Sequence, residues 1–135
     1  YLGQGSAGEV GHEILDLPNR KEVEDFVSAK FFQKFQSNPN TLRQQAEAGD
    51  AFTRSAFREF GKNLGIEIAN LVNLLDPEAI ILGGGIAGAY DLFIESTRET
   101  AAELIVIPES KDIKIINSAL GPAGGAIGAA LLAEL

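Results

Sequence analysis

Cysteine is absent from the 135 residues of this chain. This absence excludes disulfide bonds and thiolate metal sites, and it leaves the redox compartment of the protein open. Methionine is absent as well, and the sequence begins at Tyr1. We therefore expect the chain to be a fragment of a longer polypeptide.

Positive charge and long apolar runs are also scarce. The 11 lysines and arginines stand against 19 aspartates and glutamates, which gives a net charge of −8. Such a chain lacks the basic patch that binds nucleic acid or an anionic membrane surface. No segment approaches the roughly 18 unbroken apolar residues of a membrane span, and no signal pattern is present. We expect a single cytoplasmic domain over residues 1–135, without nucleic acid or membrane partners.

The most informative stretch is residues 79–88, where a short apolar run meets a cluster of glycines. The apolar part, residues 79–82, is typical of a strand buried on both faces within an α/β sheet. Gly83, Gly84 and Gly85 follow directly. Glycine allows positive φ and close backbone approach, so this turn either receives a flat ligand or makes a tight connection from strand to helix.

Apolar periodicity predicts helices on both sides of this strand. Steps of three and four residues predict one amphipathic helix over residues 21–35 and a long helix that is capped by Asp50 and ends near Leu75. Further expected elements are a short helix at 41–48, a helix at 90–104, a strand at 113–116 and a small-residue helix that closes 121–132. The order of strands and helices predicts an α/β fold.

Gly61 and Gly65 lie four residues apart on one face of the long helix. Glycine inside a helix costs about 1 kcal/mol relative to alanine. We therefore expect a close neighbour on this face, which could be a strand, a helix or a nucleotide base. Packing against another element is the simpler explanation.

Two glycine patterns suggest nucleotide binding to different degrees. Gly83, Gly85 and Gly88 fit the G-x-G-x-x-G pattern of dinucleotide sites, with Glu109 as the acidic residue for the ribose. The fit is incomplete, because Glu109 comes later than the expected spacing of ~20 residues and a long helix precedes the motif. The glycines of residues 121–128 lack the Lys-Ser/Thr pair of a phosphate loop, so we reject that reading.

Glu9, His12 and Glu24 form another candidate site. The first two lie in a glycine-rich loop over residues 1–12, and Glu24 falls near the start of the following helix. Carboxylates and imidazole can hydrogen-bond the neighbouring hydroxyls of a sugar. Each residue also has an ordinary explanation, since acidic residues such as Glu24 suit the positive end of a helix.

Several motifs follow one another at a spacing typical of one family. They are the loop Gly8-Glu9-Val10-Gly11-His12, the helix start Glu24-Asp25-Phe26-Val27-Ser28, the stretch 70–78, the strand and turn 80–86, and Ser118-Ala119-Leu120-Gly121. Together they resemble ROK proteins, the family of bacterial-type sugar kinases and sugar-responsive repressors. The resemblance covers nearly the whole chain.

This resemblance implies the carboxyl-terminal lobe of an actin-like, ribonuclease-H-like ATPase fold, with sugar and ATP bound between two lobes. It implies that Glu9, His12 and Glu24 hold the sugar and that residues 83–85 lie against the adenosine. The implied activity is that of a glucokinase-like enzyme, which phosphorylates a hexose hydroxyl with ATP and magnesium as cofactors.

The same resemblance implies parts that this sequence lacks. The catalytic aspartate would lie in an amino-terminal lobe, so we assign no catalytic residue and expect this chain alone to be inactive. Strand edges left unpaired by the missing part lead us to expect a homo-oligomer. Many family members bind zinc with the loop histidine and a cysteine cluster. The interval between His12 and Glu24 has no cysteine, so we expect no bound metal.

Two alternatives to the kinase stay open. The chain could be the sugar-sensing domain of a ROK-type transcriptional repressor, which an upstream helix-turn-helix would identify. It could also be a nucleotide- or dinucleotide-binding domain that depends on the glycine turn alone, which a titration with NAD would test.

Overall fold

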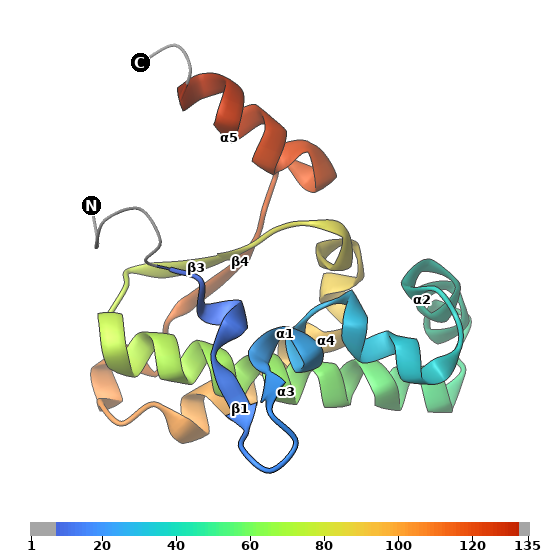
Figure 1. Cartoon of the computed structure of the whole chain (residues 1–135), viewed down its shortest axis with the longest axis horizontal. Helices are drawn as coiled ribbons and strands as arrows, with labels where there is room; N and C mark the ends of the chain where they lie inside the picture. The colour runs from blue at the N-terminus through green and yellow to red at the C-terminus, as the bar shows by residue number, and fades with distance from the viewer. Residues whose placement is uncertain (1–7, 133–135) are drawn as a thin grey trace.

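A long helix, α3, crosses the lower half of the molecule in Figure 1, which draws this computed structural model. The structure describes residues 8–132, without the side chains of residues 122 and 132. The elements are η1 (Val10–His12), β1 (Ile14–Asp16), β2 (Lys21–Glu22), α1 (Val23–Val27), η2 (Ala29–Phe35), α2 (Pro39–Glu47), α3 (Ala51–Leu75), β3 (Ala79–Leu82), η3 (Gly85–Ala89), α4 (Tyr90–Leu104), η4 (Pro108–Ser110), β4 (Lys114–Asn117), η5 (Gly121–Ala123) and α5 (Gly124–Leu132), where η marks a 3-10 helix.

Helix α3 begins and ends where the sequence predicts. The Asp50 side chain accepts a hydrogen bond from the backbone N–H of Thr53 at 2.8 Å, which satisfies a free donor of the first turn. Asp76 ends the helix in the left-handed conformation, with φ of 45°. The apolar steps of this helix predict a buried stripe of Phe57, Phe60, Leu64, Ile68, Leu71 and Leu75. This prediction is wrong at the carboxyl end, where Val72 is buried and Leu75 is 51% exposed. The last turn of α3 therefore extends beyond the core.

Helix α4 is the close neighbour that Gly61 and Gly65 predict. A Cβ on Gly61 would overlap the Ser96 hydroxyl and the Phe93 carbonyl oxygen, and one on Gly65 would lie 2.6 Å from the carbonyl oxygen of Thr97. Both contacts are with α4, which lies beside α3 (Figure 1). The packing explanation of the two glycines is therefore confirmed.

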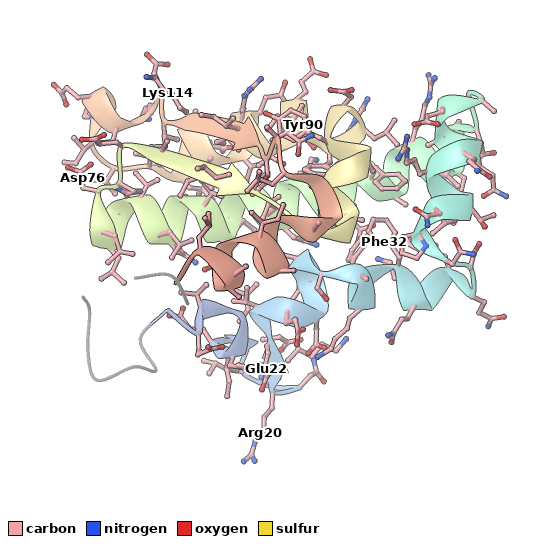
Figure 2. All side chains as sticks on the ribbon, turned by 90° about the horizontal axis from the view of Figure 1, so that it is seen from above. Arg20, Glu22, Phe32, Asp76, Tyr90 and Lys114 are labelled. Atoms are coloured by element: carbon pink, nitrogen blue, oxygen red, sulfur yellow. The ribbon has the colours of Figure 1, made fainter. Side chains whose placement is uncertain are left out.

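Two hydrophobic clusters share the α3 and α4 pair. The first is largely aromatic and joins η2 and α2 to these helices, through Phe31, Phe32, Leu42, Ala46, Phe57, Phe60, Ala89 and Phe93. The second joins the β-sheet to them, through Ile68, Ala69, Val72, Ile94, Ala101, Ile105 and Ile115. The labelled Phe32 marks the first cluster in Figure 2.

Strands β3 and β4 form a parallel pair, with Ala79 opposite Lys114 and Leu82 opposite Asn117. Helix α4 connects them, so the unit is the β-α-β arrangement of α/β folds. The prediction that β3 is buried on both faces is wrong, because Ile81 is 70% exposed. Among the described residues, α3 and α4 cover only the opposite face of this sheet.

The predicted single helix over residues 21–35 is also wrong. Its first two residues form β2, which pairs with β1 in an antiparallel hairpin. Helix α1 then ends at Ser28, which has an extended backbone. The Ser28 hydroxyl accepts the backbone N–H of Lys30 and begins the 3-10 helix η2. Strand pairing and this side-chain bond thus override the helical periodicity.

Helix α5 projects away from the other helices (Figure 1). Its sequence is composed of small and apolar residues, and Leu131 is 60% exposed. Within residues 8–132, none of the helices is both long enough and apolar enough to cross a lipid bilayer.

Candidate functional site

The candidate sugar residues begin in the loop before β1. Glu9 precedes η1, and its carbonyl oxygen accepts the backbone N–H of His12 at 3.1 Å. The His12 ring extends toward the β1–β2 hairpin, where its Nδ1 atom lies 3.0 Å from Glu22 Oε2. Residues 1–7 of the predicted loop lie outside the described residues.

Glu22 and Glu24 come from the junction of β2 with α1. Glu22 is the N-cap of α1, and its backbone N–H donates to Asp25 Oδ2 at 3.0 Å in a capping box. Glu24 lies in the first helical turn. One side-chain ligand atom from each of His12, Glu22 and Glu24 lies within 4.8 Å of the other two. We call these three residues the polar cluster.

The structure brings together two of the three residues that the sequence singles out, namely His12 and Glu24. Glu9 is exposed at the other end of η1 and lies outside the polar cluster. Glu22 takes the third position, which sequence reasoning missed, because in the sequence Glu22 is one of several acidic residues near the start of a predicted helix and has no distinguishing signal. Its contact with His12 depends on the β1–β2 pairing, which opposes Ile14 to Glu22.

The charges in the polar cluster are paired. The hydrogen bond and negative charge of Glu22 raise the pKa of His12 above its usual value, and Glu24 and Glu9 act in the same direction. Lys30 Nζ donates to Glu24 Oε2, and this bond raises the pKa of the Lys30 ammonium group. In Figure 2, Glu22 lies on the side of the molecule that carries the β1–β2 hairpin. The Arg20 side chain extends outward from this hairpin, away from Glu22.

Metal binding by the polar cluster has little support from its chemistry. The three side chains offer one imidazole and two carboxylates, which are partly exposed and already engaged with each other or with Lys30. A structural zinc site takes four ligands, usually including thiolates. The absence of bound zinc therefore stays a prediction.

The glycine turn (residues 83–85) lies at the carboxyl end of β3. Gly84 has φ of 83°, a conformation that a residue with a side chain rarely adopts. The Ser118 N–H donates to the Leu82 carbonyl oxygen at 2.8 Å, so the turn is fixed against the segment after β4. The predicted tight turn from strand to helix is therefore present.

The same glycine turn borders a pocket of about 640 Å³. We call it the α2 pocket, and its lining residues are Val27, Ser28, Ala29, Asn38, Pro39, Asn40, Thr41, Gln44, Gly83, Gly85 and Ile86. The lining combines apolar side chains, flat glycine backbone and carboxamide groups, which suits an aromatic ring with polar edges. None of these lining residues, all from the described part of the chain, carries a carboxylate, the side-chain ligand that magnesium prefers.

Helix α1 connects the polar cluster with the α2 pocket. Glu24 lies in its first turn, and Val27 at its other end lines the pocket. Three residues of helix span only about 4.5 Å along the axis. The two candidate sites are therefore direct neighbours on one short element.

The acidic residue of the dinucleotide alternative lies in the wrong place. Glu109 shares a cavity of about 300 Å³ with Asp76 and Glu78. Asp76 and Glu78 precede β3, so this cavity lies at the amino ends of the strands, whereas the glycine turn lies at the carboxyl end. Dinucleotide sites gather their ligands at the carboxyl ends of parallel strands, so the position of Glu109 at the opposite edge of the sheet disfavours this alternative.

Helix α3 carries an unusual buried acid that sequence reasoning missed. Glu67 is 4% exposed, and neither carboxylate oxygen has a hydrogen-bond partner among the described residues. Burial raises the pKa of the Glu67 carboxyl, and the nearby charge of Glu13 adds to this effect, while Asn70 opposes it. The sequence signal that could have revealed this buried acid is its position in α3, where Glu67 stands between Ile66 and Ile68.

Comparisons with known proteins agree with the fold and the motifs. The family model described as "ROK family" matches residues 2–135. The xylose repressor of Caldicellulosiruptor bescii is 32% identical in a gapped alignment of 138 positions, which covers 82% of this chain and 35% of that protein. The glucokinase of Halalkalibacterium halodurans is 34% identical over 91 residues, which cover 66% of this chain and 27% of that protein.

A solved structure extends the likeness to three dimensions. It is a ROK family glucokinase from Streptomyces griseus in complex with glucose and AMPPNP, with a TM-score of 0.81 and 23% identity. The match covers 96% of this chain and 52% of that chain. This chain thus spans about a third of the repressor and half of the solved glucokinase. Its α/β structure is part of the actin-like ATPase fold of ROK sugar kinases, and by its motifs, fold and family match the chain belongs to the ROK family.

Proposed function

We propose that this chain is the carboxyl-terminal lobe of an ATP-dependent sugar kinase of the glucokinase type. Glu9, His12 and Glu24 would bind the sugar, and Gly83, Gly84 and Gly85 would lie against the adenosine of ATP. Phosphoryl transfer depends mainly on positioning and on neutralising phosphate charge. The base for the attacking hydroxyl and the magnesium ligands would lie outside this chain.

The observation that carries this proposal is the position of α1 between the two candidate sites. Phosphoryl transfer requires the acceptor hydroxyl to lie next to the terminal phosphate of the donor. Glu24 and Val27 stand at opposite ends of α1, in the polar cluster and the α2 pocket. The Streptomyces griseus glucokinase binds glucose and AMPPNP in the same fold, which supports this pairing.

Glu22 would orient His12 in this site rather than contact the sugar. A carboxylate on Nδ1 fixes the orientation of an imidazole and leaves Nε2 free for another partner. The Nε2 atom of His12 would then be the one that meets a sugar hydroxyl. Lys30 Nζ already donates a hydrogen bond to Glu24 Oε2. The sugar would therefore displace this ammonium group or share the carboxylate with it.

Titration of the chain with D-glucose, D-xylose and ADP tests the proposal, because NMR shift changes detect binding even at millimolar affinity. A kinase lobe should bind a sugar near Glu24 and ADP near Gly85. The chain alone should produce no sugar phosphate from ATP, because the second lobe is required. ATP-dependent phosphorylation of glucose by the purified chain would refute this division of parts.

The second candidate function is the sugar-sensing domain of a ROK repressor. The 32% identity with a xylose repressor favours it. This function predicts sugar binding with no response to ADP, and the net charge of −8 would leave DNA contacts to another domain. In either function we propose a cytoplasmic homo-oligomer.

A further inference from the structure

Helix α2 turns one polar face toward the α2 pocket. Asn40, Thr41 and Gln44 line the pocket, and the spacing of four residues places Asn40 and Gln44 on the same side of the helix. The opposite side is fixed in the aromatic cluster by Leu42 and Ala46, which are 4% and 0% exposed. The core therefore sets which side chains the helix presents to the pocket.

Some polar side chains of the pocket already make hydrogen bonds within the protein, and others are, within the described residues, free to bond a ligand. Asn38 Oδ1 accepts the backbone N–H of Thr41 at 2.9 Å, and Ser28 Oγ accepts the backbone N–H of Lys30 at 3.1 Å. The carboxamides of Asn40 and Gln44 make no hydrogen bond with any residue in the described part of the chain. They are exposed and can each offer one acceptor and two donors.

The remaining walls suit a planar ring. Ile86 and Pro39 supply apolar surface, while Gly83 and Gly85 supply backbone without side chains. Nothing lies within 4 Å of the position that a Cβ on Gly85 would take, so the ring would have room at this wall. A base in this space would direct one polar edge toward the α2 carboxamides.

We infer that Asn40 and Gln44 select the nucleobase, and that they favour adenine over 6-oxopurines. This inference rests on the proposed nucleotide site. Adenine presents a donor at N6 beside an acceptor at N7, which matches the acceptor and donor of one carboxamide. Hypoxanthine presents acceptors at both positions, so one of these two hydrogen bonds is lost.

Comparison of ADP with IDP tests the inference, because the two nucleotides differ at the 6 position of the base. Dissociation constants are measured by NMR titration of the 135-residue chain. The wild-type chain should bind ADP about fivefold more tightly than IDP, as expected for one net hydrogen bond. Gln44→Leu should reduce this ratio to nearly one.

Gln45→Leu is the matched control, because Gln45 is exposed on α2 but lines a different pocket. It should keep the ADP preference of the wild type. Asn40→Ala provides a second variant if Gln44→Leu does not fold, as judged by circular dichroism. It should also reduce the ratio.

Equal affinities of the wild-type chain for ADP and IDP would overturn this inference and leave the nucleotide site in place. Retention of the ratio by folded Gln44→Leu and Asn40→Ala would have the same effect. Failure of both nucleotides to bind, with glucose binding intact, would remove the nucleotide site and the inference together.

Discussion

Glu22 Oε2 lies 3.0 Å from His12 Nδ1, although the two residues are ten positions apart in the sequence. The β1–β2 hairpin brings them together by setting Ile14 opposite Glu22. The pair is open to water on one side, with the His12 and Glu22 side chains 62% and 40% exposed. It can therefore respond to the pH of the solution.

Glu22→Gln should lower the pKa of His12 toward its usual value of about 6.5, because the hydrogen bond and charge of Glu22 are the main causes of the raised value. The raised pKa means that the pair stabilises the fold fully below pH ~6.5 and loses this effect as the pH rises through the pKa of folded His12. NMR titration of the imidazole measures the change. Glu13→Gln is the control, and a His12 pKa that is equal in both variants would contradict the assignment.

Glu24→Gln should weaken sugar binding by roughly tenfold, because hydrogen bonds to a charged carboxylate are stronger than those to an amide. Affinity for ADP should change little. Asp25→Asn is the matched control: it removes a partner in the capping box, so it should lower stability by about 1 kcal/mol without affecting the sugar. If Glu24→Gln lowers stability and leaves sugar affinity unchanged, Glu24 serves only the helix start.

Gly61→Ala should destabilise the fold by about 3 kcal/mol, because the new methyl group would overlap Ser96 and the backbone of Phe93 on α4. Gly65→Ala should have a similar effect. Thermal or urea unfolding measures the loss. Gly128→Ala in α5 is the control, since its Cβ would meet nothing within 4 Å and alanine is the better helix former. Equal stabilities of all three variants would show that α3 and α4 are not this close.

Glu67→Gln should raise stability at pH 7 by about 1 kcal/mol or more, because a buried carboxylate is unfavourable when, as among the described residues, nothing hydrogen-bonds its oxygens. The pKa of Glu67 is raised on folding, so the wild type should lose stability as the pH rises from about 4.5 through that pKa. The variant should lack this loss. Unfolding free energies between pH 4 and 8 test it, with exposed Glu103→Gln as the control. If the unfolding free energies of the wild type and Glu67→Gln change with pH in parallel, ionised Glu67 does not destabilise the fold.

Ile81→Lys should reduce self-association of the chain. Ile81 and its strand partner Ile116 are 70% and 45% exposed on the uncovered face of the sheet. Apolar surface of this kind favours association with another chain, and a charge at its centre opposes it. Sedimentation velocity at several concentrations is the measurement. A wild-type chain that stays monomeric at high concentration would refute the proposed homo-oligomer.

Local signals in the sequence were sufficient for the main helices. The cap at Asp50 and the apolar steps of α3 depend on neighbouring residues, so the predicted bounds agree with the structure. The region of residues 21–35 could not be predicted in the same way. Its phenylalanines have helical spacing, but pairing with β1 and the Ser28 hydroxyl divide it into a strand, a short helix and a 3-10 helix.

The candidate sites were predictable only in part for the same reason. The glycine turn follows from a local pattern, and its backbone conformation requires glycine at residue 84. Glu22 joins His12 through a hairpin contact, which no periodicity reveals. The α2 pocket combines three separate segments of the chain, one of which lies about forty residues beyond the other two, so Gln44 gave no signal of its own.

The close contact at Gly61 and Gly65 also has a consequence for motion. Because Gly61 and Gly65 have no side chains, backbone and short side chains of α4 lie directly against the α3 backbone, and sliding of one helix along the other would cause steric clashes. The polar cluster rests on α3 through α1, and the glycine turn leads directly into η3 and α4. Both therefore rest on the same pair of closely packed helices, so we expect them to move together. Amide protons along the shared face of these two helices should accordingly be among the slowest to exchange with deuterium.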